Sequence, residues 1–217
     1  MALGLGCMGQ AQGLDGITND QAAGGLREAL GRGVQTAVAE TGRPGGYFEN
    51  AAIKIVMPPK LGIVEKGLRA GGMGGQVDSF VKSMNEAAEK AAPEAKVIFV
   101  SALKQMSIED AKGIVTGGDT SGTEFFKRKT NAELTEAFRP IIEKQMANVG
   151  VNEKFQSLMG SAPKMPFMKS PTLDINGYVL QKAIDGLFYM MAQEEKKIRT
   201  NPAAQVTPLL KMVFGHR

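Results

Sequence analysis

The segment 117–123, with the sequence GGDTSGT, has the residue types of an anion-binding site. Two glycines open it, three hydroxyl side chains follow, and Lys127 and Arg128 come shortly after. Backbone N–H groups at a helix start bind phosphate or carboxylate groups, and nearby hydroxyls and cations add to such a site. The pattern predicts an anion site formed by Gly118, Asp119, Thr120, Ser121 and Thr123. The same residues also suit a plain junction, in which a Gly-Gly C-cap meets an Asp or Thr N-cap, and both interpretations stay open.

Carboxylates are the other groups that could do chemistry, and the nominal candidates are Asp119, Asp185, Glu194 and Glu195. Asp185 lies beside the apolar face of a long predicted helix, where burial would raise its pKa. An aspartate in such a place also serves as a buried cap or a salt-bridge partner. The only cysteine is Cys7 and the only histidine is the penultimate residue, His216. Because zinc sites and Ser-His-Asp or Cys-His units need more of these residues, we predict no catalytic residue, no metal and no cofactor.

Composition places the chain among ordinary globular proteins, with 43% apolar and 22% charged residues in a length of 217. Thirteen Met, 27 Gly and no Trp indicate a helical core packed with small and flexible side chains. The net charge of +4 is mild, and no aromatic residues interleave with the basic ones, so we expect no nucleic-acid binding. No apolar run reaches the roughly 20 residues of a membrane-spanning helix, so we expect no transmembrane segment.

The longest amphipathic helix is predicted over 173–199, and the other elements must position the candidate residues around it. Asp174 can cap its start, and Asn201 followed by a proline can end it. Near its end, the spacing predicts that Glu194 pairs with Lys197, and Glu195 with Arg199, along the helix surface. Its apolar stripe consists of Leu180, Ala183, Ile184, Leu187, Phe188 and Met191.

Further helices are predicted over 18–40, 60–70, 76–92, 93–106, 107–116, 130–146, 152–159 and 203–214. The helix at 93–106 is apolar on most sides, because it carries apolar residues at Val97, Ile98, Val100 and Leu103. We therefore expect this helix to be central. Capping patterns at Ser107 and Thr130 predict two of the helix starts. The only strand candidate is 52–57, AIKIVM, which has no convincing partner. We therefore expect an all-α, single multi-helix, bundle-like domain with at most one short β element near 52–57.

Two segments lack the helical pattern of the rest of the chain. Residues 1–13 read as the remnant of an export signal or a disordered N-terminus, which leaves 14–217 as the single helical domain. From the signal-like residues we expect a periplasmic or otherwise exported protein. Cys7 loosely fits a lipoprotein cleavage site, which makes it a candidate for lipidation. The proline-rich loop at 160–171 carries Pro166, Phe167 and Met168, which either form a lid over a groove or fill a surface gap.

Several segments give the chain a family resemblance: 84–89 (MNEAAE), 106–111 (MSIEDA), 117–126 (GGDTSGTEFF), 130–140, 173–188 and 194–202 (EEKKIRTNP). On these segments the chain resembles the bacterial family known as domain of unknown function 4197, found largely in proteins with export signals. The resemblance covers 14–214 and implies one helical domain of exported, bacterial origin. It implies no activity and no catalytic residue.

For function, we expect a non-enzymatic binding protein of the bacterial envelope, whose ligand is an apolar or amphipathic, lipid-like molecule. Pockets between bundle helices commonly hold such ligands. The alternative is a structural or protein-interaction module that binds another envelope protein, which would show a contiguous exposed apolar patch. A third alternative is a carboxylate-dependent enzyme, for which no nucleophile–base pair is visible.

Overall fold

The computed structural model describes residues 19–148, 150, 153, 155–157, 160, 174–205 and 211, with the backbone alone at 19–22. The described residues form helices, turns and loops, and none of them lies in a strand. This confirms the predicted all-α class. The elements are α1 (Asn19–Gly42), η1 (Pro59–Leu61), α2 (Gly62–Ala70), α3 (Gly74–Ala91), η2 (Ala92–Glu94), α4 (Ala95–Lys104), α5 (Ile108–Thr116), α6 (Ser121–Asn148), α8 (Ile175–Thr200) and η3 (Pro202–Ala204).

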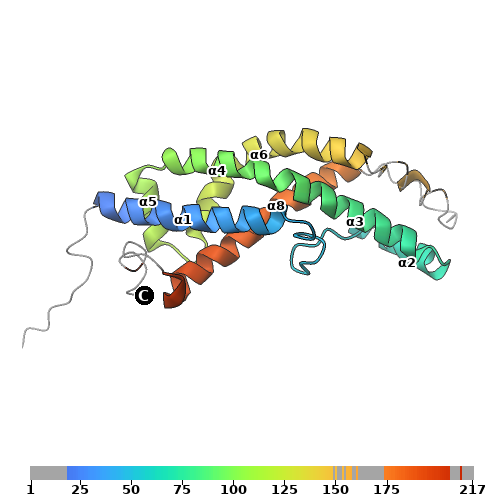
Figure 1. Cartoon of the computed structure of the whole chain (residues 1–217), viewed down its shortest axis with the longest axis horizontal. Helices are drawn as coiled ribbons and strands as arrows, with labels where there is room; N and C mark the ends of the chain where they lie inside the picture. The colour runs from blue at the N-terminus through green and yellow to red at the C-terminus, as the bar shows by residue number, and fades with distance from the viewer. Residues whose placement is uncertain are drawn as a thin grey trace, which may run out of the picture.

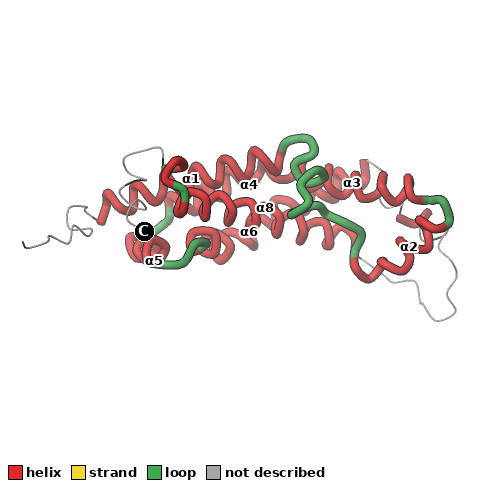
Figure 2. Tube along the Cα trace, turned by 90° about the horizontal axis from the view of Figure 1, so that it is seen from below, coloured by secondary structure: helices red, strands yellow, loops and turns green. Residues whose placement is uncertain are grey.

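The helices form an elongated bundle in which α8 runs obliquely and packs against α1, α3 and α6 (Figure 1). The helices α3 and α4 follow one another through η2 without a loop, and both pack against α6. Figure 2 shows α5 near one end of the bundle and α2 at the other, where α2 folds back on α3. Because α8 contacts three long helices, its residues can link elements that are distant in the sequence.

The predicted boundaries and inner face of α8 agree with the structure. Asp174 caps the helix by accepting a hydrogen bond from the Gly177 N–H at 2.8 Å, and the helix ends before Asn201. Its predicted apolar residues are buried, which places the stripe in the common core. The predicted Ser107 cap is also confirmed, because Ser107 and Asp110 form a reciprocal capping box at the start of α5.

The strand candidate at 52–57 is not a strand: residues 52 and 53 end the turns that follow α1, and residues 54–57 connect these turns toward the short helix η1. Its side chains alternate as in a strand, with Ile53, Ile55 and Met57 buried. The Asn85 side chain on α3 accepts a hydrogen bond from the Ile55 N–H at 2.8 Å and donates one to the Ile55 carbonyl at 2.8 Å. One side-chain amide thus satisfies the backbone groups that a neighbouring strand would otherwise bind.

The expectation that α4 is central is wrong. Val97 is 73% exposed and Val100 is 38% exposed, while the buried side of the helix carries Ile98, Phe99 and Leu103. A window of apolar residues cannot distinguish a central helix from a surface helix whose outer face also carries valines. The side of α4 that carries Val97 and Val100 is therefore exposed at the surface.

The predicted helix start at Thr130 is also wrong, because α6 runs unbroken from Ser121 to Asn148. The Thr130 hydroxyl donates a hydrogen bond at 2.7 Å to the Phe126 carbonyl, four residues earlier in the same helix. A threonine in mid-helix commonly makes this bond, so a Thr-x-x-Glu pattern alone does not locate a helix start.

Candidate functional site

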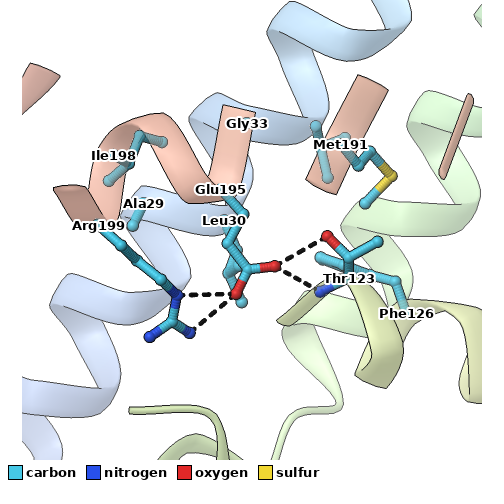
Figure 3. Close-up of a pocket in the computed structure, with 10 residues that line it drawn as sticks. Ala29, Leu30, Gly33, Thr123, Phe126, Met191, Glu195, Ile198 and Arg199 are labelled. Carbon is cyan, nitrogen blue, oxygen red and sulfur yellow. Dashed lines mark hydrogen bonds and ion pairs between the residues drawn. The ribbon is translucent and has the colours of Figure 1, made fainter. Parts of the chain in front are cut away.

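The Glu195–Arg199 pair lies inside the protein and not on the surface of α8, so the predicted surface pairing of these two residues is wrong in its location. The side chains of Glu195 and Arg199 are 5% and 1% exposed. Arg199 donates to Glu195 Oε1 through Nη2 at 2.8 Å and through Nε at 3.0 Å (Figure 3). Such a charge-assisted pair is strong, but burial makes it depend on complete hydrogen bonding.

Glu195 also binds the start of α6. Its carboxylate accepts hydrogen bonds from the Gly122 N–H at 2.8 Å, the Thr123 N–H at 2.7 Å and the Thr123 hydroxyl at 2.8 Å. The negative charge therefore lies at the positive end of the helix dipole, as an anion at a helix N-terminus does. Gly122 permits this approach, because a Cβ at this position would lie 3.0 Å from Glu195 Oε1.

Arg199 extends the network to a third helix. Its Nη2 donates a hydrogen bond at 2.9 Å to the carbonyl of Ile114, which lies in the last turn of α5. A cation at a helix C-terminus complements the negative end of the helix dipole. The pair thus joins the end of α5, the start of α6 and the last turns of α8.

The residues predicted to form an anion site lie in and just before the first turn of α6. Gly118 and Asp119 are exposed, Thr120 and Ser121 are half-buried, and Thr123 is buried. Two of the backbone N–H groups at this helix start already bind the chain's own Glu195. An external anion at these residues stays a prediction. Local sequence could not identify Glu195 as the acceptor, because it is more than 70 residues away.

A small cavity borders this network, lined by residues of α1, α6 and α8 that include Leu30, Phe126 and Met191. Its volume is about 10 Å³, which is room for one water molecule. Nearby, the ring centroids of Phe99 and Phe126 are 5.2 Å apart, and those of Phe99 and Phe188 are 5.9 Å apart. A lipid chain does not fit between the helices at this point.

A second buried carboxylate, Glu89 on α3, holds the loop that follows α1. Its Oε1 accepts hydrogen bonds from the N–H groups of Tyr47 and Phe48, and its Oε2 accepts one from Gly45, each at 3.1 Å. The Tyr47 hydroxyl donates a hydrogen bond at 2.6 Å to the Ala183 carbonyl on α8. Burial raises the pKa of Tyr47, so its hydroxyl stays protonated and remains a donor. Glu89 and Tyr47 together fix the loop between α3 and α8.

The loop fixed by Glu89 forms one wall of an open groove with a volume of about 610 Å³. The helix α3 forms the opposite wall, and Gln145 of α6 also lines the groove. Within the lining, Lys82 pairs with Glu86 at 3.7 Å. The lining residue Phe48 also contacts Lys54, which does not line the groove: its ammonium lies 3.9 Å from the centroid of the Phe48 ring. The lining residues are Gly42, Pro44, Gly45, Phe48, Glu49, Lys82, Ser83, Glu86, Ala87, Glu89, Lys90 and Gln145.

Sequence reasoning missed this groove, although the sequence contains one signal for it. Asn85 and Glu89 are four residues apart on α3, within a stretch whose neighbours Val81, Met84 and Ala88 are apolar. Polar residues at helical spacing on a buried face indicate that something polar must be bound there. What they bind is the backbone of the 43–57 connection.

The four candidate carboxylates do not form one site. Asp119 is exposed before α6, and Asp185 in mid-α8 accepts a hydrogen bond from the Gln181 side chain at 2.9 Å. Glu194 pairs with Lys197 at 3.8 Å, and Glu195 belongs to the buried network. Among the described residues, no group of three His, Cys, Asp or Glu side chains is arranged to hold a metal ion.

Two further predictions concern residues outside the described part of the chain. Pro166, Phe167 and Met168, proposed as a lid, fall there, and so do Cys7 and the export-signal segment 1–13. In the part that the structure describes, no helix combines the length and the apolar character that a membrane span requires.

A family model described as "Protein of unknown function (DUF4197)" matches residues 16–215. The chain belongs to the DUF4197 family. No curated protein and no solved structure matches it.

In this DUF4197 protein, the segments that carried the family resemblance supply residues of the Glu195–Arg199 network and also Asn85 and Glu89, which bind the 43–57 connection. The segment 84–89 provides Asn85 and Glu89, and the segment 117–126 provides the N–H groups that bind Glu195. The segment 194–202 provides Glu195 and Arg199 themselves. The resemblance thus rests in part on residues that join distant elements.

We predict that Glu89→Gln frees the loop that forms the groove. A glutamine has one acceptor oxygen and places an NH₂ group against the loop N–H groups, so at least one of the three hydrogen bonds is lost. The expected cost is about 1–3 kcal/mol of unfolding free energy, with faster hydrogen exchange at the amides of Gly45, Tyr47 and Phe48. Glu86→Gln, one turn earlier in a half-exposed pair with Lys82, is the control. Equal exchange rates in both variants would contradict the role of Glu89.

Proposed function

We propose that this DUF4197 protein is a non-enzymatic binding protein, and that its ligand is a small amphipathic molecule held in the groove between the 42–49 loop and α3. The observation that carries this proposal is the groove volume of about 610 Å³, which lies in the range of small-molecule sites. The cavity between α1, α6 and α8 has a volume of about 10 Å³ and is too small for such a ligand, so we place the ligand in the groove.

The chemistry of the lining supports an amphipathic ligand. Phe48 and Ala87 offer apolar contacts. Lys90 and Gln145 offer a cation and an amide, and Glu49 and the Lys82–Glu86 pair add further charged groups. A molecule with an apolar part and a polar end can satisfy both kinds of group, whereas a purely apolar one would bury the polar groups without partners.

The chain's own hydrogen bonds hold the walls of the groove. The side chains of Glu89 and Asn85 on α3 accept hydrogen bonds from backbone N–H groups and so hold the loop and the connector in place. Because a preformed site loses little conformational entropy on binding, such a site favours affinity. These two residues therefore position the groove without having to contact the ligand.

The proposal also places the protein in the bacterial envelope, as the export-like residues 1–13 led us to expect. Fractionation of the native bacterium, followed by immunodetection, tests this part. Recovery in the cytoplasmic fraction would contradict it and would leave the groove proposal untouched.

Binding of the fluorescent amphiphile dansyl-undecanoate tests the groove. We expect saturable binding of one probe per chain, and about tenfold weaker binding by Phe48→Ala, because the ring contributes apolar contact area. Tyr189→Ala is the matched control, since Tyr189 is exposed on α8 and does not line the groove. Circular dichroism verifies that both variants are folded.

Two outcomes would contradict the proposal. One is the absence of saturable probe binding to the wild-type protein. The other is an equal loss of affinity in Phe48→Ala and Tyr189→Ala, which would place the probe at a nonspecific surface.

A further inference from the structure

Two polar side chains in the lining of the groove have no partner among the described residues. Lys90 is exposed in the last turn of α3, and Gln145 of α6 is half-buried. Neither side chain makes a hydrogen bond or an ion pair with a described residue, and the acids one turn away from Lys90, Glu86 and Glu94, do not pair with it. These two side chains are therefore able to bind a ligand without giving up a contact within the protein.

The other polar side chains of the lining are already bound by the protein. Glu89 accepts hydrogen bonds from three backbone N–H groups of the loop. Lys82 pairs with Glu86 at 3.7 Å, and Glu49 pairs with Arg43 at the same distance. A ligand that used one of these groups would compete with the contact that the group already makes.

Net charge does not select the sign of the ligand, because the charges around the groove balance. Counting the charged lining residues and those that contact them or the Phe48 ring, there are four acids and four cations. The acids are Glu40, Glu49, Glu86 and Glu89, and the cations are Arg43, Lys54, Lys82 and Lys90.

Hydrogen-bonding capacity does select the polar end of the ligand. The Lys90 ammonium has three donors and the Gln145 amide has two, whereas the amide carbonyl is the one acceptor of the pair. A carboxylate, which only accepts hydrogen bonds, matches these donors, and its bond to an ammonium is of the strong, charge-assisted kind. A cationic end would find only the carbonyl oxygen of Gln145.

We propose that the ligand of the groove ends in a carboxylate and that Lys90 forms an ion pair with it. The proposal rests on the groove function proposed above and names the class of the ligand, an amphipathic carboxylic acid such as a fatty acid. Its apolar chain contacts Phe48 and Ala87. A phosphate monoester carries about two negative charges, which one cation without an ion pair would not balance.

Two probes with the same apolar chain test the role of Lys90. Dansyl-undecanoate has a carboxylate, and its primary amide has no charge. We expect Lys90→Gln to weaken the binding of dansyl-undecanoate by about tenfold, because a charge-assisted bond is lost. The same variant is expected to bind the amide within about twofold of the wild type. Comparing the two probes separates the ion pair from any general change of the groove.

Lys104→Gln is the matched control, since Lys104 is an exposed lysine on α4 and does not line the groove. We expect it to bind both probes like the wild type, and circular dichroism verifies the fold of each variant. Competition with laurate and with dodecyl phosphate compares the two acids, and laurate is expected to compete more strongly.

The outcomes separate this proposal from that of the groove itself. Unchanged binding of dansyl-undecanoate by Lys90→Gln would overturn the ion pair, and so would an equal loss for both probes or an equal loss in Lys104→Gln. In these cases the groove would still be tested separately by Phe48→Ala. Stronger competition by dodecyl phosphate would overturn the choice of a carboxylate. Saturable binding of neither probe to the wild type would overturn both proposals.

Discussion

Glu195→Ala is expected to lower the free energy of unfolding by about 3–5 kcal/mol, the usual effect of removing one partner of a buried ion pair. The substitution leaves the Arg199 guanidinium buried without its carboxylate. It also removes the acceptor of the Gly122 and Thr123 N–H groups and of the Thr123 hydroxyl. Urea unfolding followed by circular dichroism measures the loss.

Glu194→Ala is the control for this measurement, because Glu194 is the neighbouring residue and, among the described residues, forms an ion pair only with Lys197, at 3.8 Å. We expect a change of about 0.5 kcal/mol or less. A double variant, Glu195→Met with Arg199→Met, is expected to be more stable than Glu195→Ala, because it leaves no uncompensated buried charge. Equal losses from Glu194→Ala and Glu195→Ala would show that the buried network does not carry this stability.

Gly186→Ala has the second large expected effect, a loss of about 1–3 kcal/mol through overpacking. A Cβ at position 186 would lie 2.6 Å from Tyr47 Cε1 and 3.2 Å from Ile53 Cβ. Tyr47 cannot easily move away, because its ring is fully buried and its hydroxyl is bound to the Ala183 carbonyl. The added methyl group therefore pushes the loop away from α8, and thermal unfolding measures the cost.

Gly113→Ala in α5 is the matched control, since it makes the same chemical change within a helix. A Cβ at position 113 would meet no atom within 4 Å. Alanine is favoured over glycine in a helix by about 1 kcal/mol, so this variant is expected to be slightly more stable than the wild type. If both variants change the free energy of unfolding in the same direction and by the same amount, the close approach of α8 to Tyr47 does not cause the effect of Gly186→Ala.

Local patterns in the sequence were sufficient to predict the helices that have strong caps and a continuous apolar stripe. The helix α8, with its cap at Asp174, and the start of α5 at Ser107 agree with the structure. Both depend on residues within one or two turns, so the information is local. The helix start predicted at Thr130 was wrong, because Thr130 offers a capping pattern that α6 passes through.

Burial was decided by the tertiary structure. Glu195 and Arg199 have the spacing of an ordinary surface pair, yet they are buried because the start of α6 and the end of α5 cover them. Conversely, Val97 lies at the surface because no described element covers that side of α4. Helical spacing fixes which residues share a face, but only packing decides whether that face meets protein or solvent.

The sequence by itself determined the all-α class and the polar residues that the fold must satisfy. Only the tertiary structure decided what they bind, because Glu89 holds backbone more than 40 residues earlier and Glu195 holds backbone more than 70 residues earlier. A buried carboxylate takes whichever N–H groups packing brings to it, and sequence distance does not restrict that choice. The groove follows from the same cause, since Glu89 on α3, one wall of the groove, binds the backbone of the loop that forms the other wall.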